Sequence, residues 1–94
     1  MMNKRAHILF SGDVDGTGYR FFLQQKGQEL GLKGYIKKTE AGKIEAVVEG
    51  KEQSIHEYVR FIENGVSMQA NWQEYTVDYF DTLVGYTSLS SEIV

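Results

Sequence analysis

The sequence of 94 residues contains no cysteine and no proline. Without cysteine the chain can form no disulfide, no thiolate nucleophile and no zinc site built on Cys ligands. Its two histidines, His7 and His56, lie far apart and belong to no metal-ligand pattern, so we expect no metal site and no catalytic role for either. Positive charge is also scarce, since 10 lysines and arginines stand against 13 acidic residues, for a net charge of −3. This balance argues against a nucleic-acid binder, which usually carries a basic surface.

Long apolar runs are missing as well. No stretch approaches the roughly 20 apolar residues that a membrane-spanning helix needs, and the first residues lack the apolar core of a signal peptide. We therefore expect a soluble, cytoplasmic protein with no membrane partner. With 94 residues, of which 41% are hydrophobic, the chain has the size and apolar content of one domain covering residues 1–94.

Glycine, in place of proline, separates the expected elements. Alternating apolar residues predict strands at 5–10, 32–38, 43–49 and 72–80, with Gly50 ending the third. Helical spacing predicts helices at 19–30 and from 55 to about 65. Gly31 stands where a helix C-terminal glycine belongs, and Gly27 predicts a close approach of the first helix to the sheet. The tail from Leu83 has no clear pattern, and we expect a short edge strand there. The order β-α-β-β-α-β predicts a ferredoxin-like α+β sandwich, an antiparallel sheet with two helices on one face.

Residues 12–20, with the sequence GDVDGTGYR, join the first strand to the first helix. Three glycines let this backbone turn tightly and expose successive N–H groups. The start of the helix adds unpaired amides and the positive end of its dipole, which together favour phosphate, sulfate or carboxylate. Arg20 adds a bidentate donor for phosphate oxygens. An arginine in a first helical turn does nothing to relieve the helix dipole, which indicates a functional reason for this residue. An ordinary strand-to-helix turn is the alternative, since no lysine follows as in a Walker A loop.

The loop residues resemble the acylphosphatase signature GxVQGVGFR. Residues 30–38, LGLKGYIKK, are similar to the family's LGLxGWVxN, and further matches fall at 42–45, 49–50 and 61–65. The resemblance covers roughly residues 8–65 in order and in spacing, whereas the C-terminal third matches poorly. It implies a cofactor-free hydrolase that cleaves an acyl phosphate into a carboxylate and phosphate.

By motif position, the resemblance also implies the site. The loop amides and the arginine bind the phosphoryl group in this family, which implies as phosphate-binding residues Asp15, Gly16, Thr17, Gly18, Tyr19 and Arg20. The family's water-orienting asparagine corresponds to Lys38, so the implied catalytic residues are Arg20 and Lys38. A lysine ammonium only donates hydrogen bonds and cannot accept one from the attacking water. This predicts impaired turnover. For Lys38 itself the alternative is an ordinary solvated residue at the strand end, like Lys37.

Two acidic residues of the loop, Asp13 and Asp15, stand where the family usually has arginine and glutamine. Their carboxylates oppose an anionic ligand if they point inward, and Asp side chains in such turns more often bond to their own backbone. A pairing of Lys38 with Asp13 or Asp15 is a further hypothesis. Thr17 replaces the usual valine and offers a hydroxyl to a phosphate oxygen or a water.

These departures leave two functions open: an acylphosphatase with a weakened water-positioning group, or a non-catalytic module that kept the scaffold. Both bind a small-molecule acyl phosphate or inorganic phosphate, and we expect a monomer. A third reading, an RNA-binding module, rests on residues 33–35, KGY, which faintly resemble the start of an RNP1 motif. RNP1 belongs on the third strand and this stretch is the second. We expect Tyr35, His7 and Lys37 to form an ordinary solvated sheet face instead.

Overall fold

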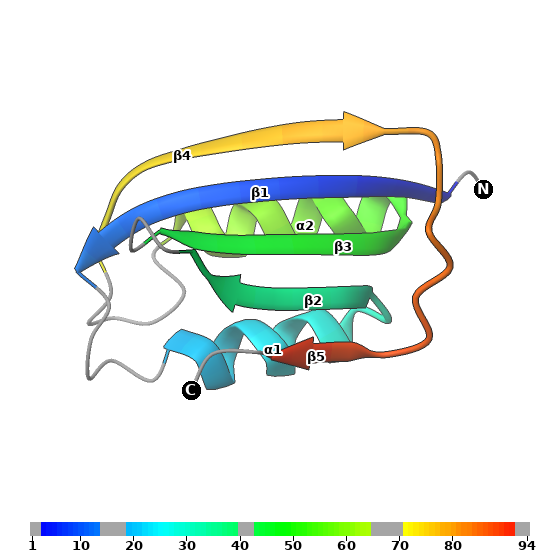
Figure 1. Cartoon of the computed structure of the whole chain (residues 1–94), viewed down its shortest axis with the longest axis horizontal. Helices are drawn as coiled ribbons and strands as arrows, with labels where there is room; N and C mark the ends of the chain where they lie inside the picture. The colour runs from blue at the N-terminus through cyan, green and yellow to red at the C-terminus, as the bar shows by residue number, and fades with distance from the viewer. Residues whose placement is uncertain (1–2, 14–18, 40–42, 65–70, 92–94) are drawn as a thin grey trace.

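A computed structural model of the chain describes residues 3–13, 19–39, 43–64 and 71–91 (Figure 1). For residues 11–13, 19–20 and 71–75 only the backbone is described. The elements are, in order, β1 (Asn3–Asp13), α1 (Tyr19–Glu29), β2 (Lys33–Lys38), β3 (Ile44–Lys51), α2 (Glu52–Glu63), β4 (Asn71–Phe80) and β5 (Leu89–Ser91). The expected β-α-β-β-α-β order is confirmed, and β5 is the short strand expected in the tail.

The strands form one sheet in the order β4-β1-β3-β2-β5. β1 pairs antiparallel with both β3 and β4, and β2 pairs antiparallel with β3. β5 instead pairs parallel with β2, so the expectation of a wholly antiparallel sheet is wrong at this edge. The reason is the path of residues 81–88, which cross the end of the sheet from β4 to β5 (Figure 1). After that crossing the chain runs alongside β2 in the same direction.

The core lies between the sheet and the two helices, which cover one of its faces. β1 alternates as predicted, with Ala6, Ile8 and Phe10 buried under the helices. His7 and Leu9 are partly exposed on the opposite face. The periodic apolar residues of α2 are also buried, and they are Ile55, Tyr58, Val59 and Ile62. The two hydrophobic patterns therefore meet in one layer, which confirms the ferredoxin-like α+β sandwich.

Two strands are longer than the alternation predicts. β1 extends to Asp13, and β3 continues through Gly50 to Lys51. Gly50 does not end the strand, because it keeps its place opposite Lys4 of β1. A Cβ at Gly50 would lie 2.7 Å from Cδ2 of Leu32, so the glycine provides room for a core side chain.

The end of α1 confirms the role predicted for its glycines. Gly31 has a φ of 75°, and its N–H donates to the carbonyl of Gln28 at 3.0 Å. The N–H of Leu32 donates to the carbonyl of Gly27 at 2.9 Å, which completes a Schellman cap. A Cβ at Gly27 would lie 2.3 Å from Cδ2 of Leu89. Gly27 therefore marks the close approach of α1 to the sheet, at its β5 edge.

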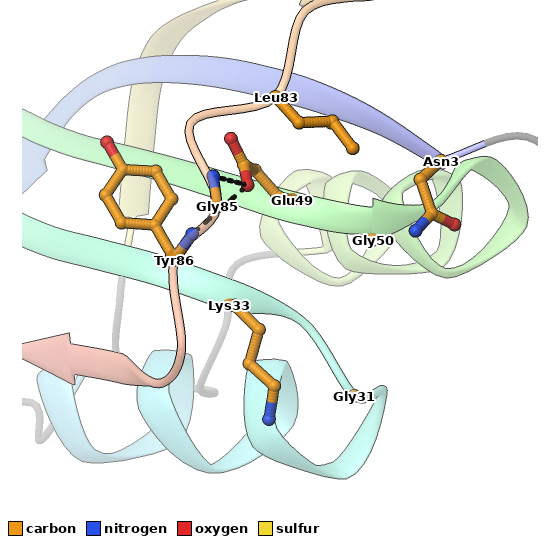
Figure 2. A pocket seen from close by; sticks show the side chains of 8 residues that line it. All are labelled: Asn3, Gly31, Lys33, Glu49, Gly50, Leu83, Gly85 and Tyr86. Carbon is orange, nitrogen blue, oxygen red and sulfur yellow. Dashed lines mark hydrogen bonds between the residues drawn. The ribbon is translucent and has the colours of Figure 1, made fainter.

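A buried carboxylate fastens the crossing segment 81–88 to the sheet. Glu49 of β3 is only 6% exposed. Its carboxylate accepts a hydrogen bond from the backbone N–H group of Val84. It also accepts from the backbone N–H groups of Gly85 at 3.0 Å and Tyr86 at 3.4 Å (Figure 2). These bonds place the segment over the open face at the end of β3, on its way to β5.

Substitution of Glu49 by glutamine is therefore expected to lower the free energy of unfolding by about 2–3 kcal/mol. Glutamine keeps one acceptor oxygen but turns an NH₂ group toward backbone N–H donors, so part of the bonding is lost in a buried place. Urea unfolding would measure the change. The matched control is Glu57→Gln on the exposed surface of α2, which should stay within about 0.5 kcal/mol of the parent. Equal stability of the two variants would contradict the anchoring role.

Candidate functional site

The predicted site residues come from segments that the fold brings to the same end of the sheet. β1 ends at Asp13 and α1 begins at Tyr19, so the glycine-rich loop connects these two points. Phe10 of β1 pairs with Ile44 of β3, which pairs in turn with Lys38 at the end of β2. The ends of β1 and β2 and the start of α1 therefore lie at one end of the molecule, the left end in Figure 1.

Lys38 lies on the helix-covered side of the sheet. Directly paired residues of antiparallel strands project from the same face, and its partner Ile44 is 1% exposed within the core. Lys38 itself is exposed, because it is the last residue of β2. The neighbouring Lys37 projects from the opposite, uncovered face, where its Nζ lies 3.6 Å from Oε1 of Glu45. Of these two adjacent lysines, Lys38 is therefore the one on the side where α1 begins.

The turn after Lys38 is closed by contacts between two residues. The N–H of Thr39 donates to the carbonyl of Lys43 at 2.7 Å, and the N–H of Lys43 donates to Oγ1 of Thr39 at 3.2 Å. These bonds fix the backbone of the β2 end next to Lys38. The predicted hairpin between the second and third strands is confirmed, since β2 and β3 are antiparallel neighbours.

Most of the predicted phosphate-binding residues fall outside the part of the chain that the structure describes. These are Asp15, Gly16, Thr17 and Gly18. Tyr19 and Arg20 are the first two residues of α1, with only their backbone described, and the same holds for Asp13 at the end of β1. The hypothesis that Lys38 pairs with Asp13 or Asp15 therefore stays a prediction.

Phe21 and Phe22, in the first turn of α1, form an exposed aromatic pair that the sequence pattern does not predict. Phe22 falls in the helical pattern that predicts a buried face, but it is 40% exposed, and Phe21 is 63% exposed. Their rings contact each other edge to face, with centroids 5.6 Å apart. Leu23, the next residue, is fully buried. The signal available in the sequence is a run of three large apolar residues, of which one helix face can bury only part.

The uncovered face of the sheet has a polar cluster centred on Glu45. Its carboxylate accepts a hydrogen bond from Tyr35 at 2.9 Å and lies 3.2 Å from Nε2 of His7 and 3.6 Å from Lys37. Desolvation by itself raises the pKa of Glu45, but these three neighbours outweigh it and hold the pKa below its ordinary value. Tyr35, His7 and Lys37 thus lie on the face predicted for them.

A pocket of about 350 Å³ lies at the opposite end of the sheet from Lys38 (Figure 2). The residues around it include Lys33 and the buried Glu49. The carboxylate of Glu49 is already engaged by the backbone N–H groups of the crossing segment. Lys33 is the one cationic side chain among the described residues that line this pocket, so the pocket offers little positive charge to an anion.

No group of three His, Asp or Glu side chains among the residues described could hold a metal ion. No helix within those same ranges is long and apolar enough to cross a membrane.

Comparison with known proteins identifies the family. The acylphosphatase family model matches residues 6–88, which extends past the motifs into the crossing segment. An acylphosphatase of Caldanaerobacter subterraneus is 36% identical over 86 residues, covering 85% of this chain and 96% of that protein. One of Haloarcula marismortui is 35% identical over 81 residues, covering 86% of this chain and 88% of that protein. The crystal structure of acylphosphatase from Bacillus subtilis superimposes with a TM-score of 0.87 at 27% identity, covering 94% and 97% of the two chains. This chain therefore belongs to the acylphosphatase family, whose members are hydrolases.

Proposed function

We propose that this protein hydrolyses acyl phosphates at the end of the sheet where β1 ends and α1 begins. The observation that supports this best is the meeting of three features there: the glycine-rich loop, the N-terminus of α1 and the end of β2 with Lys38. Membership of the acylphosphatase family supports the same location, because the two motifs that resemble the family's signatures are the ones that converge.

In the proposed reaction the backbone amides from Asp15 to Arg20 and the guanidinium of Arg20 hold the phosphoryl oxygens. A water oxygen forms a bond to phosphorus, the bond from phosphorus to the acyl oxygen breaks, and a carboxylate and phosphate leave. The water releases its proton to the phosphate or to solvent. Phosphoryl transfer depends mainly on positioning and charge stabilisation, which amides, a helix dipole and an arginine supply without a cofactor.

Lys38 gives this site an unusual balance between binding and turnover. Its ammonium adds a positive charge on the helix-covered side of the sheet end, which favours an anionic phosphate. The ammonium has three donors and no acceptor, so it cannot orient the attacking water by accepting a hydrogen bond from it. We therefore expect tight binding of phosphate and slow turnover compared with a site that has asparagine at this position.

The test is release of inorganic phosphate from benzoyl phosphate by the purified protein, corrected for spontaneous hydrolysis. Release above the rate in buffer, inhibited by added phosphate, is the expected result. A rate equal to that in buffer would exclude the enzyme. If phosphate then still raised the melting temperature, the protein would be the alternative, a module that binds phosphate or acyl phosphates without cleaving them.

Three further expectations belong to this proposal. The ligand is a small molecule, the protein acts as a monomer, and it works in the cytoplasm. Light scattering across a range of protein concentrations would test the second of these. A stable dimer would contradict it.

The acidic residues of the loop lead to a prediction about affinity. Replacing both Asp13 and Asp15 by asparagine should tighten phosphate binding by roughly tenfold at low salt. The reason is that a carboxylate about 4 Å from a phosphate charge costs between about 1 and 4 kcal/mol, depending on solvent exposure. Isothermal titration with inorganic phosphate at low and high salt would measure the effect, which should shrink as salt screens the charges.

The matched control for that experiment is Asp78→Asn, an exposed carboxylate of β4 on the uncovered side of the sheet. It removes a negative charge without touching the loop. Equal phosphate affinity in the loop variant and the parent would show that both loop carboxylates face away from the ligand.

A further inference from the structure

Two exposed phenylalanines stand directly beside the proposed phosphate site. Phe21 follows Arg20 in the chain and is 63% exposed, and Phe22 is 40% exposed. Their rings touch edge to face, with centroids 5.6 Å apart, so they form one apolar surface. A contiguous exposed apolar surface is a candidate binding surface, whereas single exposed hydrophobic residues need no explanation.

The position of this surface follows from the helix. Leu23 is fully buried, and its carbonyl accepts a hydrogen bond from the hydroxyl of Tyr58 on α2. Since successive helical residues are rotated by about 100°, Phe21 projects about 200° away from Leu23, that is, away from the sheet. Helical side chains also lean toward the N-terminus of their helix. Phe21 therefore covers the outer side of the first turn of α1, next to the helix N-terminus at which the proposed phosphate site lies.

The chemistry of the proposed reaction gives this outer side a role. The attacking and leaving oxygens of a phosphoryl transfer are roughly in line on opposite sides of phosphorus. Lys38, at the family's water-positioning place, lies on the sheet side of the α1 N-terminus. A water that attacks from the sheet side expels the acyl oxygen toward the outer side. The acyl group of the substrate then extends toward Phe21.

We propose that Phe21 and Phe22 form the surface that binds the acyl group, and that the protein prefers acyl phosphates with an aromatic or bulky aliphatic acyl group. This inference rests on the proposed function and adds the substrate class. A small acyl group, such as acetyl, has little apolar surface to bury against either ring. An aromatic acyl group removes both its own apolar surface and that of Phe21 from water.

The test compares benzoyl phosphate with acetyl phosphate, using kcat/KM divided by the spontaneous rate of each compound. We expect the parent to prefer benzoyl phosphate and Phe21→Ala to lose about tenfold of that preference. Phe21→Leu should recover part of it, because leucine restores apolar area. The control is Phe80→Ala, an equally large exposed side chain at the other end of the molecule, with the preference kept within about twofold (Figure 1).

A second measurement is independent of turnover. Benzylphosphonate and methylphosphonate keep the phosphoryl oxygens and are not hydrolysed, so their dissociation constants report binding alone. We expect benzylphosphonate to bind more tightly, with the difference reduced about tenfold in Phe21→Ala. This result would support the acyl surface even if benzoyl phosphate were not cleaved, in which case only the hydrolysis would be excluded.

The outcomes separate the two proposals. Hydrolysis of both substrates with a ratio unchanged by Phe21→Ala would overturn the acyl surface and leave the proposed function standing. Failure to release phosphate and to bind either phosphonate would overturn both. A concentration-dependent dimer that Phe21→Ala dissociates would show that the aromatic pair contacts a second copy of the chain. This result would also overturn the proposal that the pair binds the acyl group.

Discussion

Replacement of Arg20 by alanine is expected to lower the rate of phosphate release from benzoyl phosphate by about 10³-fold or more. Arg20 is the second residue of α1 and follows the glycine-rich loop in the sequence. Its guanidinium is the one group of the proposed site that combines a fixed positive charge with two parallel donors for phosphate oxygens. The same variant should lose most of its affinity for inorganic phosphate, because this charge stabilises the bound anion as well as the transition state.

Two other variants make this result specific. Arg20→Lys keeps the charge but not the planar fork, so its rate should fall between those of the parent and Arg20→Ala. Arg60→Ala removes an exposed arginine of α2 and should leave the rate within about twofold of the parent. An unchanged rate in Arg20→Ala would refute the assignment of the site.

The free energy of unfolding of Arg20→Ala is a second readout. It would fall if Arg20 had a purely structural role. α1 has no acidic residue in its first turn, and a positive charge there is unfavourable next to the positive end of the dipole. Removal of Arg20 should therefore leave the free energy of unfolding unchanged or raise it by up to about 1 kcal/mol. Loss of activity together with equal or greater stability would identify Arg20 as a residue kept for its ligand.

The elements that the sequence predicts well are those with strong periodicity on one buried face. The alternation of Ala6, Ile8 and Phe10 and the helical spacing of Ile55 and Ile62 both lead directly to buried side chains. These local patterns are sufficient because each element buries one face against a single layer. Their order along the chain then limits the topology to the ferredoxin-like arrangement.

The features that the sequence did not predict depend on contacts between distant segments. β5 has three residues and no periodic pattern, so its parallel pairing with β2 follows only from the path of the crossing segment. Glu49 alternates with core residues in the manner of a solvent-facing side chain, yet backbone N–H groups 35–37 residues later cover it. Local pattern cannot show such a cover, because the covering segment is irregular.

The candidate site also has features that the sequence predicts and features that it does not. The placement of Arg20 and Lys38 at one end of the sheet follows from topology alone, since the ends of β1 and β2 lie there. The exposure of Phe21 was not predictable, because a run of apolar residues at a helix start does not show which of them faces the core. The side of the sheet on which Lys38 lies required the register with Ile44.

The other large effect is expected from Lys38→Asn, which should raise kcat for benzoyl phosphate by a factor on the order of 10²–10³. An asparagine can accept a hydrogen bond from the attacking water through its oxygen and hold the water or phosphate through its NH₂ group. Gain of one positioned hydrogen bond in the transition state has about the effect that removal of one has in oxyanion holes. Steady-state phosphate release, with kcat and KM determined separately, would measure it.

The separation of kcat from KM distinguishes the two roles considered for Lys38. If its ammonium lies beside the phosphate, the asparagine variant gains kcat but binds phosphate more weakly, so KM and the inhibition constant of phosphate both rise. If Lys38 is only a solvated strand-end residue, phosphate inhibition stays the same while kcat still rises. Lys37→Asn is the control, since Lys37 projects to the opposite face beside Glu45 and should change neither constant by more than about twofold. An unchanged kcat in Lys38→Asn would contradict the water-positioning role at this place, and turnover would then depend on the loop and Arg20 alone.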